Sequence, residues 1–166
     1  MGSCSHEHHN ALHGVHDHPN VAQRLAEAES LCAATGARLT PLRKEVLELI
    51  LNATGPMGAY DLLAQMKNAS DRPAAPPTVY RGLDFLLENG LIHRLASLNA
   101  YIGCSHPEVA HEGYFMICQQ CNNAYELAQH TAIDAAIAQE AELMGFAVET
   151  QTVEILGTCA ECRAQV

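Results

Sequence analysis

The stretch that decides the fold is residues 76–104, PPTVYRGLDFLLENGLIHRLASLNAYIGC. Apolar side chains recur in it at three- and four-residue intervals, namely Val79, Leu83, Leu86 and Leu87. This spacing predicts a helix from Pro77 to Asn89, with Gly90 at its C-terminal end. Residues 91–98 and 101–104 predict two short strands joined by a turn at Asn99. Helices followed by such a hairpin are typical of a winged helix-turn-helix domain.

Three more helices are expected upstream of this stretch. Residues 21–35 have a helical pattern that ends at Gly36, and residues 59–67 have a shorter one. Between them, Thr40 and Pro41 suit the N-cap and first position of a helix that ends before Gly55. Residues 68–77 are rich in proline, alanine and polar side chains and predict a loop. We therefore expect residues 20–104 to form a winged-helix DNA-binding domain.

Two Cys-x-x-Cys pairs mark the C-terminal third of the chain, Cys118/Cys121 and Cys159/Cys162. Each pair places two thiolates on one tight turn, so the two pairs together can complete a closed, structural zinc site. This site of four cysteines is called the Cys4 site below. Disulfide or redox cysteines are the alternative, but no apolar N-terminal signal segment indicates an oxidising compartment. The interval between the pairs exceeds the roughly 15–20 residues of a zinc ribbon, which predicts a small domain between them.

That second domain is expected to span residues 113–166, after a hinge at 105–112. Its expected elements are strands at 114–118 and 124–127, a helix at 130–144 and a strand at 147–157. Such a unit is too thin to bury both of its faces, so an apolar helix face suggests a homodimer interface; the face comprises Ile133, Ile137, Ala141 and Met144. Packing on the domain's own core is the alternative. The expected fold class is α+β, a winged helix-turn-helix followed by a small α/β dimerisation domain.

The charge of the chain is unevenly distributed. The 166 residues have a formal net charge of −10, yet eight of the nine basic residues lie between Arg24 and Arg94, where eight acidic residues balance them. After Asn99, nine acidic residues accompany one arginine. The first half can therefore face phosphate, whereas the second half repels it. No apolar run approaches a membrane span, so we expect a cytoplasmic protein without a membrane partner.

The predicted helix at 77–89 has features of a DNA recognition helix. It lacks an Asp, Asn or Ser cap, so its free N–H groups are available to phosphate. Thr78 and Tyr80 are placed to hold phosphate, and Arg81 suits a bidentate contact with guanine worth roughly 1–3 kcal/mol. An ordinary amphipathic surface helix is the alternative. The hairpin that follows favours double-stranded operator DNA as the partner.

Four further candidate metal ligands remain once the Cys4 site is assigned, namely His93, Cys104, His111 and Glu126. They come from both expected wing strands, the hinge and the strand after the first cysteine pair, so they span both halves of the chain. Two imidazoles, one thiolate and one carboxylate give a net charge near zero with Zn²⁺, and the soft sulfur favours zinc over Fe²⁺ or Mn²⁺. His106 and Glu108 compete as ligands, and each of the four also has an ordinary structural explanation. With the Cys4 site, this predicts two zinc ions per subunit.

Six histidines lie within residues 1–19. The segment has no apolar period, so we expect a mobile tail that binds transition metals loosely, as a weak third site. A leader segment without a specific metal site is the alternative.

Together, PPTVYRGLDFLLENGLIHR at 76–94, the YIGC strand at 101–104 and the two cysteine pairs resemble the ferric uptake regulator (Fur) family. They are most similar to its zinc uptake regulator (Zur) branch, and RLTPLR at 38–43 is similar to the family's R-x-T-x-x-R opening. The resemblance covers about residues 20–162. It implies a homodimeric, zinc-dependent repressor of zinc-uptake genes with a winged helix and a dimerisation domain.

The resemblance also implies roles for residues where the motifs match. It implies structural zinc at the four cysteines of the two pairs and regulatory zinc at the second ligand set. It implies DNA contacts by Arg81 and by Tyr60, which lies in AYDLL at 59–63. The histidine-rich run of iron sensors is absent from SHPEVAHEG at 105–113, which disfavours iron or peroxide sensing.

We expect zinc in the second site to tie His93 and Cys104 of the wing to Glu126 of the other half, while His111 holds the hinge. Without it, only the hinge would join the halves; with it, the half-site spacing is fixed near roughly 34–36 Å. The alternatives are an iron or manganese sensor of the same fold and a zinc-buffering or delivery protein. A zinc hydrolase is disfavoured because no H-E-x-x-H spacing occurs. We expect no enzymatic activity and no small-molecule substrate.

Overall fold

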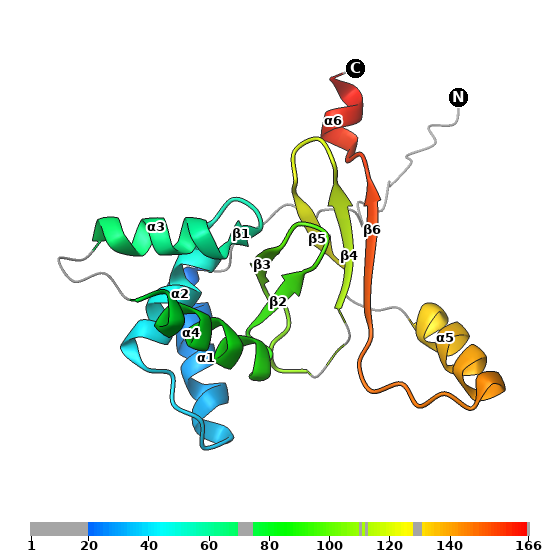
Figure 1. Cartoon of the computed structure of the whole chain (residues 1–166), viewed down its shortest axis with the longest axis horizontal. Coiled ribbons are helices and arrows are strands. Elements are labelled where there is room, and N and C mark those ends of the chain that lie inside the picture. The colour runs from blue at the N-terminus through cyan, green and yellow to red at the C-terminus, as the bar shows by residue number, and fades with distance from the viewer. Residues whose placement is uncertain (1–19, 70–74, 110, 112, 128–130, 166) are drawn as a thin grey trace, which may run out of the picture.

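The computed structural model describes residues 20–69, 75–109, 111, 113–127 and 131–165, so the histidine-rich tail lies outside the described residues. The N-terminal half contains four helices and three short strands in the order α1 (Val21–Ala34), α2 (Pro41–Asn52), β1 (Met57–Gly58), α3 (Ala59–Ala69), α4 (Pro76–Glu88), β2 (Ile92–Leu95) and β3 (Ala100–Gly103). The C-terminal half contains β4 (Gly113–Cys118), β5 (Ala124–Glu126), α5 (Thr131–Met144), β6 (Thr152–Gly157) and α6 (Ala160–Ala164). Figure 1 shows the helices of the first half beside two small sheets, and this architecture confirms the α+β class.

The helix starts follow the local sequence. The side chain of Asn20 caps α1 by accepting a hydrogen bond from the Ala22 N–H at 3.2 Å. Thr40 occupies the N-cap position of α2, as predicted, but its hydroxyl makes no capping hydrogen bond there. Helix α4 begins one residue earlier than predicted, at Pro76, and no side chain caps it. Its first N–H groups are therefore free of a side-chain acceptor, as the sequence indicated.

The hairpin of the wing is shorter than predicted. Leu95 pairs with Ala100, so β2 ends at Leu95 rather than Leu98, and residues 96–99 form the turn. Asn99 closes that turn with a φ of 48°, a conformation that asparagine tolerates better than most residues. The short strand β1, which the sequence did not predict, pairs with β3 and completes a sheet in the order β1-β3-β2.

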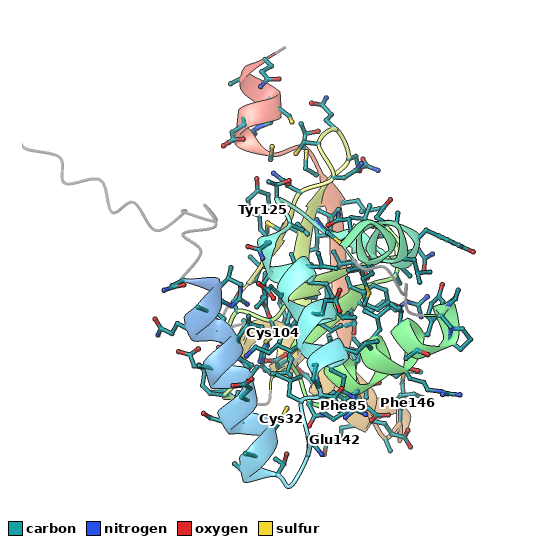
Figure 2. All side chains as sticks on the ribbon, turned by 90° about the vertical axis from the view of Figure 1, so that its left-hand side faces the viewer. Cys32, Phe85, Cys104, Tyr125, Glu142 and Phe146 are labelled. Atoms are coloured by element: carbon teal, nitrogen blue, oxygen red, sulfur yellow. The ribbon has the colours of Figure 1, made fainter. Side chains whose placement is uncertain are left out.

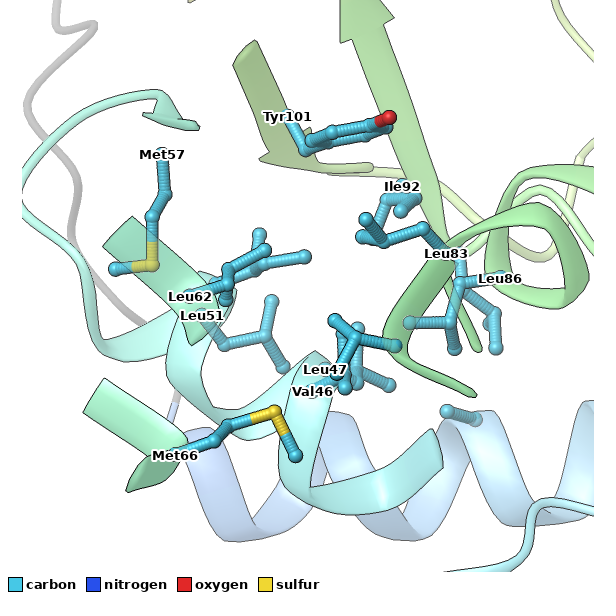
Figure 3. Packing of buried hydrophobic residues seen from close by; sticks show 14 of the residues in the cluster. Val46, Leu47, Leu51, Met57, Leu62, Met66, Leu83, Leu86, Ile92 and Tyr101 are labelled. Carbon is cyan, nitrogen blue, oxygen red and sulfur yellow. The ribbon is translucent and has the colours of Figure 1, made fainter. Parts of the chain in front are cut away.

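One hydrophobic core holds the first half together. It brings together side chains of α1, α2, α3, α4 and the wing sheet, and Val46, Leu62, Val79, Leu83 and Leu86 are fully inaccessible to solvent. Figure 3 shows Val46, Leu62, Leu83 and Leu86 among the side chains of this core. The apolar stripe of α4 predicted from the sequence is the face that this core buries, so the opposite face, which carries Arg81, is exposed.

The second half is built on a parallel strand pair. Strand β4 lies between β5 and β6, antiparallel to the first and parallel to the second. Gly113 pairs with Thr152 and Cys118 with Gly157, so residues 147–151 lie outside the β6 pairing and the predicted strand is too long by five residues. The parallel pair brings the two cysteine pairs to the same end of the sheet. The second pair lies on the short helix α6, which the sequence did not predict.

The two halves also touch each other directly. Leu95 and Ile102 of the wing pack with Phe115, Ile117 and Ala124 of the second sheet in a separate apolar cluster. In this arrangement the halves are therefore joined by packing as well as by the hinge, and the expectation that the hinge alone joins them without zinc stays a prediction.

Helix α5 and strand β6 leave much apolar surface uncovered. Helix α5 stands apart from the rest of the chain in Figure 1, and no residue of it is buried. The exposed large side chains gather along this helix, the segment after it and β6: Leu143, Met144, Phe146, Val148, Ile155 and Leu156. Of the side chains predicted to face a partner, Met144 is exposed, whereas Ile133, Ile137 and Ala141 are half-buried.

Candidate metal centres and DNA-binding surface

The four cysteines of the two pairs come together at one end of the second sheet. Cys118 ends β4, Cys121 lies in the turn after it, Cys159 caps α6 and Cys162 lies within α6. Their sulfur atoms all lie within 4.8 Å of one another. The Cys121 and Cys159 sulfurs are 3.9 Å apart, close to the roughly 3.8 Å edge of a tetrahedron with Zn–S bonds of about 2.3 Å. This geometry fits a closed tetrathiolate zinc site.

Backbone N–H groups in these turns favour the thiolate form of Cys118. The Cys159 N–H donates to the Cys118 sulfur at 3.3 Å. Hydrogen bonds from the backbone of Cys159 and Cys121 lower the pKa of Cys118 to about 6. One of the four thiols is therefore already ionised at neutral pH, which is the form that binds a metal.

The second predicted set is also brought together. His93 projects from β2, Cys104 follows β3, His111 lies in the hinge and Glu126 ends β5. One ligand atom from each lies within 4.8 Å of the other three. The Cys104 Sγ and His111 Nε2 atoms are 3.6 Å apart, which matches the edge of about 3.6 Å expected for tetrahedral Zn–S and Zn–N bonds. The competing candidate His106 is exposed, with its ring centroid 6.4 Å from that of His111, and Glu108 is exposed as well.

The Glu126 carboxylate is the centre of this set. Its Oε1 atom lies 2.7 Å from His111 Nε2 and 2.9 Å from His93 Nε2. Its Oε2 atom accepts a hydrogen bond from the Ser105 N–H at 2.8 Å. Burial acts to raise the pKa of Glu126, but the two histidines and the Ser105 N–H together lower it to about 2. The carboxylate is therefore ionised and available as a ligand at every physiological pH.

The histidine nitrogens are oriented as a metal ion requires. The His111 Nδ1 atom lies 2.8 Å from the Val109 carbonyl oxygen, which places the proton on Nδ1 and leaves Nε2 for a metal. His93 Nε2 is buried and lacks a hydrogen bond of acceptable geometry, although Glu126 is near. A buried nitrogen without such a partner, aimed at a thiol and a carboxylate, fits a metal ligand.

Cys104 requires a cation to ionise. Burial and then the nearby Glu126 carboxylate raise the pKa of Cys104 to about 12, so it is a neutral thiol at physiological pH without a metal. Figure 2 shows Cys104 in the middle of the molecule, between α1 and α2 in this view. A divalent cation supplies the positive charge that this thiolate, together with Glu126, needs in the interior.

Three residues that support this set were not predicted from the sequence. Arg24 of α1 donates a hydrogen bond from Nη2 to the Cys104 carbonyl oxygen at 2.6 Å. The Phe115 ring lies edge-on to His93, with centroids 5.2 Å apart. Gly113 leaves the space for both rings, because a Cβ there would lie 2.8 Å from Phe115 Cε2. The contacts of Arg24 with Cys104 and of Phe115 with His93 join segments distant in sequence, so no local pattern reveals them.

The predicted DNA-contacting residues are all exposed on the first half. Tyr60, at the start of α3, is 80% exposed and Tyr80 is 39% exposed. Thr78 and Arg81 are exposed on the first turns of α4. Behind them, the Arg43 guanidinium stacks 3.6 Å from the centroid of the Phe85 ring, which fixes α4 against α2.

None of the helices among the described residues has the length and hydropathy of a membrane span.

Comparisons with known proteins agree with these features. The chain is 41% identical over 139 residues to the zinc uptake regulation protein of Escherichia coli K12, which covers 83% of this chain and 80% of that protein. The structure of the present chain superposes with a TM-score of 0.83 on a zinc uptake regulator complexed with zinc and DNA. The sequence identity is 38%, and the match covers 88% of this chain and 97% of that one.

One related protein has been solved in two forms. The holo form of XcZur matches with a TM-score of 0.77 at 42% identity, covering 86% of this chain and 98% of that one. Its apo form matches with a TM-score of only 0.51 at 40% identity, covering 86% and 97%. At nearly equal identity, the present structure is therefore much closer to the holo form. Finally, the profile of the ferric uptake regulator family matches residues 34–156, and the chain belongs to that family.

Proposed function

We propose that this chain is a zinc-responsive transcriptional regulator that binds operator DNA as a homodimer when its second metal site is filled, and so represses zinc-uptake genes in the cytoplasm. The observation that carries the proposal is the second ligand set. Two of its ligands, His93 and Cys104, belong to the wing, and Glu126 belongs to the second sheet. Filling this site therefore fixes the DNA-binding half relative to the rest of the molecule.

The donor atoms support zinc as the metal in both sites. Four thiolates form a closed set, and two imidazoles, one thiolate and one carboxylate form the other. Both are four-donor sets that include sulfur, which suits tetrahedral Zn²⁺ better than the oxygen-rich octahedral sites of Mn²⁺. Zn²⁺ supplies a redox-inert four-coordinate cross-link at each site. We infer two zinc ions per subunit, one structural and one regulatory.

The regulatory step is a closure of the two halves. The apolar cluster of Leu95, Ile102 and Phe115 favours closure, whereas the Cys104 thiol beside Glu126 ionises only when a cation is bound. Filling the site shifts the balance towards the closed arrangement, which resembles the holo form of XcZur. The coupling between zinc and DNA is expected to be about 1–3 kcal/mol.

The homodimer is supported by the uncovered apolar surface of the second half. Leu143 and Met144 at the end of α5 are 74% and 78% exposed, and Phe146 directly after it is 65% exposed. Contiguous apolar side chains of this size are rarely left to water in a monomer. A second copy of the chain that covers them places two recognition helices on one operator.

On DNA, helix α4 is the element that contacts base edges. Arg81 is assigned to a guanine, and Thr78, Tyr80 and Tyr60 to the sugar-phosphate backbone. Their support is the exposure of all four side chains and the uncapped N-terminus of α4. The charge of the first half, with eight basic and eight acidic residues between Arg24 and Arg94, permits this approach.

The test is a mobility-shift titration on palindromic A·T-rich DNA at buffered free Zn²⁺, with the Cys4 site already filled. The wild-type chain is expected to bind only as zinc rises, and Cys104→Ala is expected to lose this dependence. Cys32→Ala is the matched control, because Cys32 is equally buried but lies in the helical core. Equal binding with Fe²⁺ or Mn²⁺ would contradict the choice of metal. Binding by Cys104→Ala that matches the wild type would contradict the assigned site.

A further inference from the structure

The turn of the wing is held by one carboxylate of the second half. Glu154 of β6 accepts a hydrogen bond from the Ala96 N–H at 2.6 Å and another from the Ser97 N–H at 2.9 Å. The Ser97 hydroxyl also donates to the same carboxylate. We call this set of contacts, made by Glu154, Ala96 and Ser97, the wing clasp. We propose that Glu154 is a positioning residue for zinc-dependent DNA binding, and this inference rests on the proposed function.

The clasp is a strong contact for a single side chain. Both carboxylate oxygens are used, and the donors are two successive backbone N–H groups and a hydroxyl. Hydrogen bonds to an ionised carboxylate are stronger than neutral ones. Burial acts to raise the pKa of Glu154, but the hydrogen bonds from Ser97 and Ala96 lower it below its usual value. Glu154 is therefore ionised at neutral pH and matched to its donors.

The position of the clasp complements that of the regulatory zinc site. His93 lies in β2, and Ser97 lies four residues later in the turn that follows, so at about 3.3 Å per extended residue the two are at most roughly 13 Å apart. The zinc ligands thus hold the base of the hairpin, and Glu154 holds its tip. A body held at one point can pivot in every direction, whereas a second, separated point leaves only rotation about the line that joins the two. Zinc and the clasp together therefore define the direction in which α4 is presented.

The clasp is anchored to rigid structure. Glu154 pairs with Phe115 in the parallel ladder between β6 and β4, and the Phe115 ring contacts His93. Three residues later, the Gly157 carbonyl oxygen accepts a hydrogen bond from the Gln119 N–H at 2.8 Å, beside the Cys4 site. The carboxylate therefore sits on a strand that is fixed at both ends, and a shift at the regulatory site is transmitted to it through β4.

The variant that tests the proposal is Glu154→Gln in the full-length, zinc-loaded chain. An amide has one acceptor oxygen, and its NH2 group faces an N–H donor, so the clasp loses at least one hydrogen bond and gains a repulsive contact. Glu149→Gln is the matched control, because it removes the same charge from an exposed position in the segment that leads to β6. Two quantities are measured: exchange of the Ala96 and Ser97 amide hydrogens, and DNA affinity at saturating and at limiting zinc.

We expect the two amides to exchange at least tenfold faster in Glu154→Gln than in Glu149→Gln. DNA affinity at saturating zinc should fall about five- to tenfold, and regulatory zinc affinity should fall with it because coupling between sites is reciprocal. Equal exchange in both variants, or equal DNA affinity, would overturn the proposal. A wild-type chain that shows no zinc-dependent DNA binding would instead refute the proposed function, and with it the role of Glu154. The exchange of the Ala96 and Ser97 amides reports separately whether the wing clasp forms.

Discussion

Arg24 and Cys104 are joined by a hydrogen bond of 2.6 Å from the guanidinium Nη2 to the Cys104 carbonyl oxygen, across 80 residues of sequence. Burial lowers the pKa of Arg24 without neutralising so strong a base, and the Glu126 carboxylate, together with Cys104 once it is ionised, acts to raise it. Helix α1 is thereby tied to the regulatory site. A positive charge beside the ligands also favours the thiolate that zinc requires.

Replacing Arg24 should weaken the regulatory site. Arg24→Met keeps the apolar stem and removes both the charge and the hydrogen bond, so zinc affinity should fall roughly tenfold, as for other partners of metal ligands. Competition with a chelator of known affinity measures this. Arg38→Met is the control, since Arg38 is exposed on the loop before α2. An equal affinity of the two variants would show that Arg24 contributes only to packing.

Zinc binding to the regulatory site should release protons. The pKa of Cys104 is raised to about 12, so its thiol proton must leave when the metal binds at neutral pH. Burial acts to lower the pKa of His111, but its hydrogen bonds with Val109 and Glu126 raise it above the usual value, so a second proton contributes as the pH falls. Zinc affinity should therefore rise with pH, by about tenfold per unit for one proton.

Calorimetry in two buffers of different ionisation enthalpy counts these protons. We expect about one proton per zinc at pH 8 and more at pH 6.5. In Cys104→Ser the thiol is absent, and the count at pH 8 should fall towards zero. A proton count in the wild type that does not differ from that in Cys104→Ser would contradict the assignment of Cys104 as a ligand.

Substitution of Gly113 tests the second metal site without replacing any of its four ligands. A Cβ at position 113 would lie 2.8 Å from Phe115 Cε2 and 3.6 Å from His93 Nδ1. Gly113→Ala should therefore displace Phe115 and, through it, His93, and lower regulatory zinc affinity several-fold. Gly157→Ala is the matched control, because that strand glycine has no atom within 4 Å of its Cβ position. The idea fails if both variants bind zinc like the wild type.

On DNA, Arg81→Ala should cost more on the operator than on unrelated DNA. Loss of a bidentate guanine contact is worth about 1–3 kcal/mol, or roughly 5- to 150-fold in affinity. Arg163→Ala removes a basic residue from α6 and is the charge-matched control. If Arg81→Ala weakens binding to all sequences equally, Arg81 contacts phosphate rather than a base.

The apolar surface after α5 should hold the dimer together. Phe146 is 65% exposed, and Phe146→Asp would place a charge where a second copy is expected to pack. We expect dissociation at micromolar concentration in analytical ultracentrifugation. Val109→Asp, at a hinge residue that is 58% exposed, is the control. A dimer of Phe146→Asp as stable as that of the control would move the interface elsewhere.

The residues of both metal sets could be predicted because donor chemistry is local information. The spacing of each Cys-x-x-Cys pair implies two thiolates on one turn. Once these four cysteines were assigned, the His, Cys and Glu side chains of the second set could be selected as candidate ligands. The buried stripe of α4 could also be predicted, because the three- and four-residue spacing of its apolar side chains is visible within the helix itself. The cysteine pairs and the α4 stripe are each contained within a few residues, whereas the second ligand set runs from His93 to Glu126 and was expected from donor chemistry and from the resemblance to the Fur family.

The supporting contacts could not be predicted in this way. Glu154 is an acidic residue in a strand, and only the packing of β6 beside the wing turn gives it a partner. Gly113 and Arg24 likewise depend on where Phe115 and Cys104 lie in space. The length of β6 was overestimated because Val148 and Thr150 are strand-forming, yet the backbone ladder between β4 and β6 starts with Gly113 opposite Thr152 and does not include residues 147–151. Strand ends are decided by the neighbouring strand.

The main hydrophobic core of the first half is made only of residues between Leu25 and Tyr101. Every side chain it needs has therefore been synthesised before Cys104 is added at the ribosome, and this half can fold while the rest of the chain is still being made. The regulatory ligands, in contrast, are incomplete until Glu126 has emerged, and the Cys4 site until Cys162. Translation therefore supplies the helical core first, the second ligand set next and the four cysteines last.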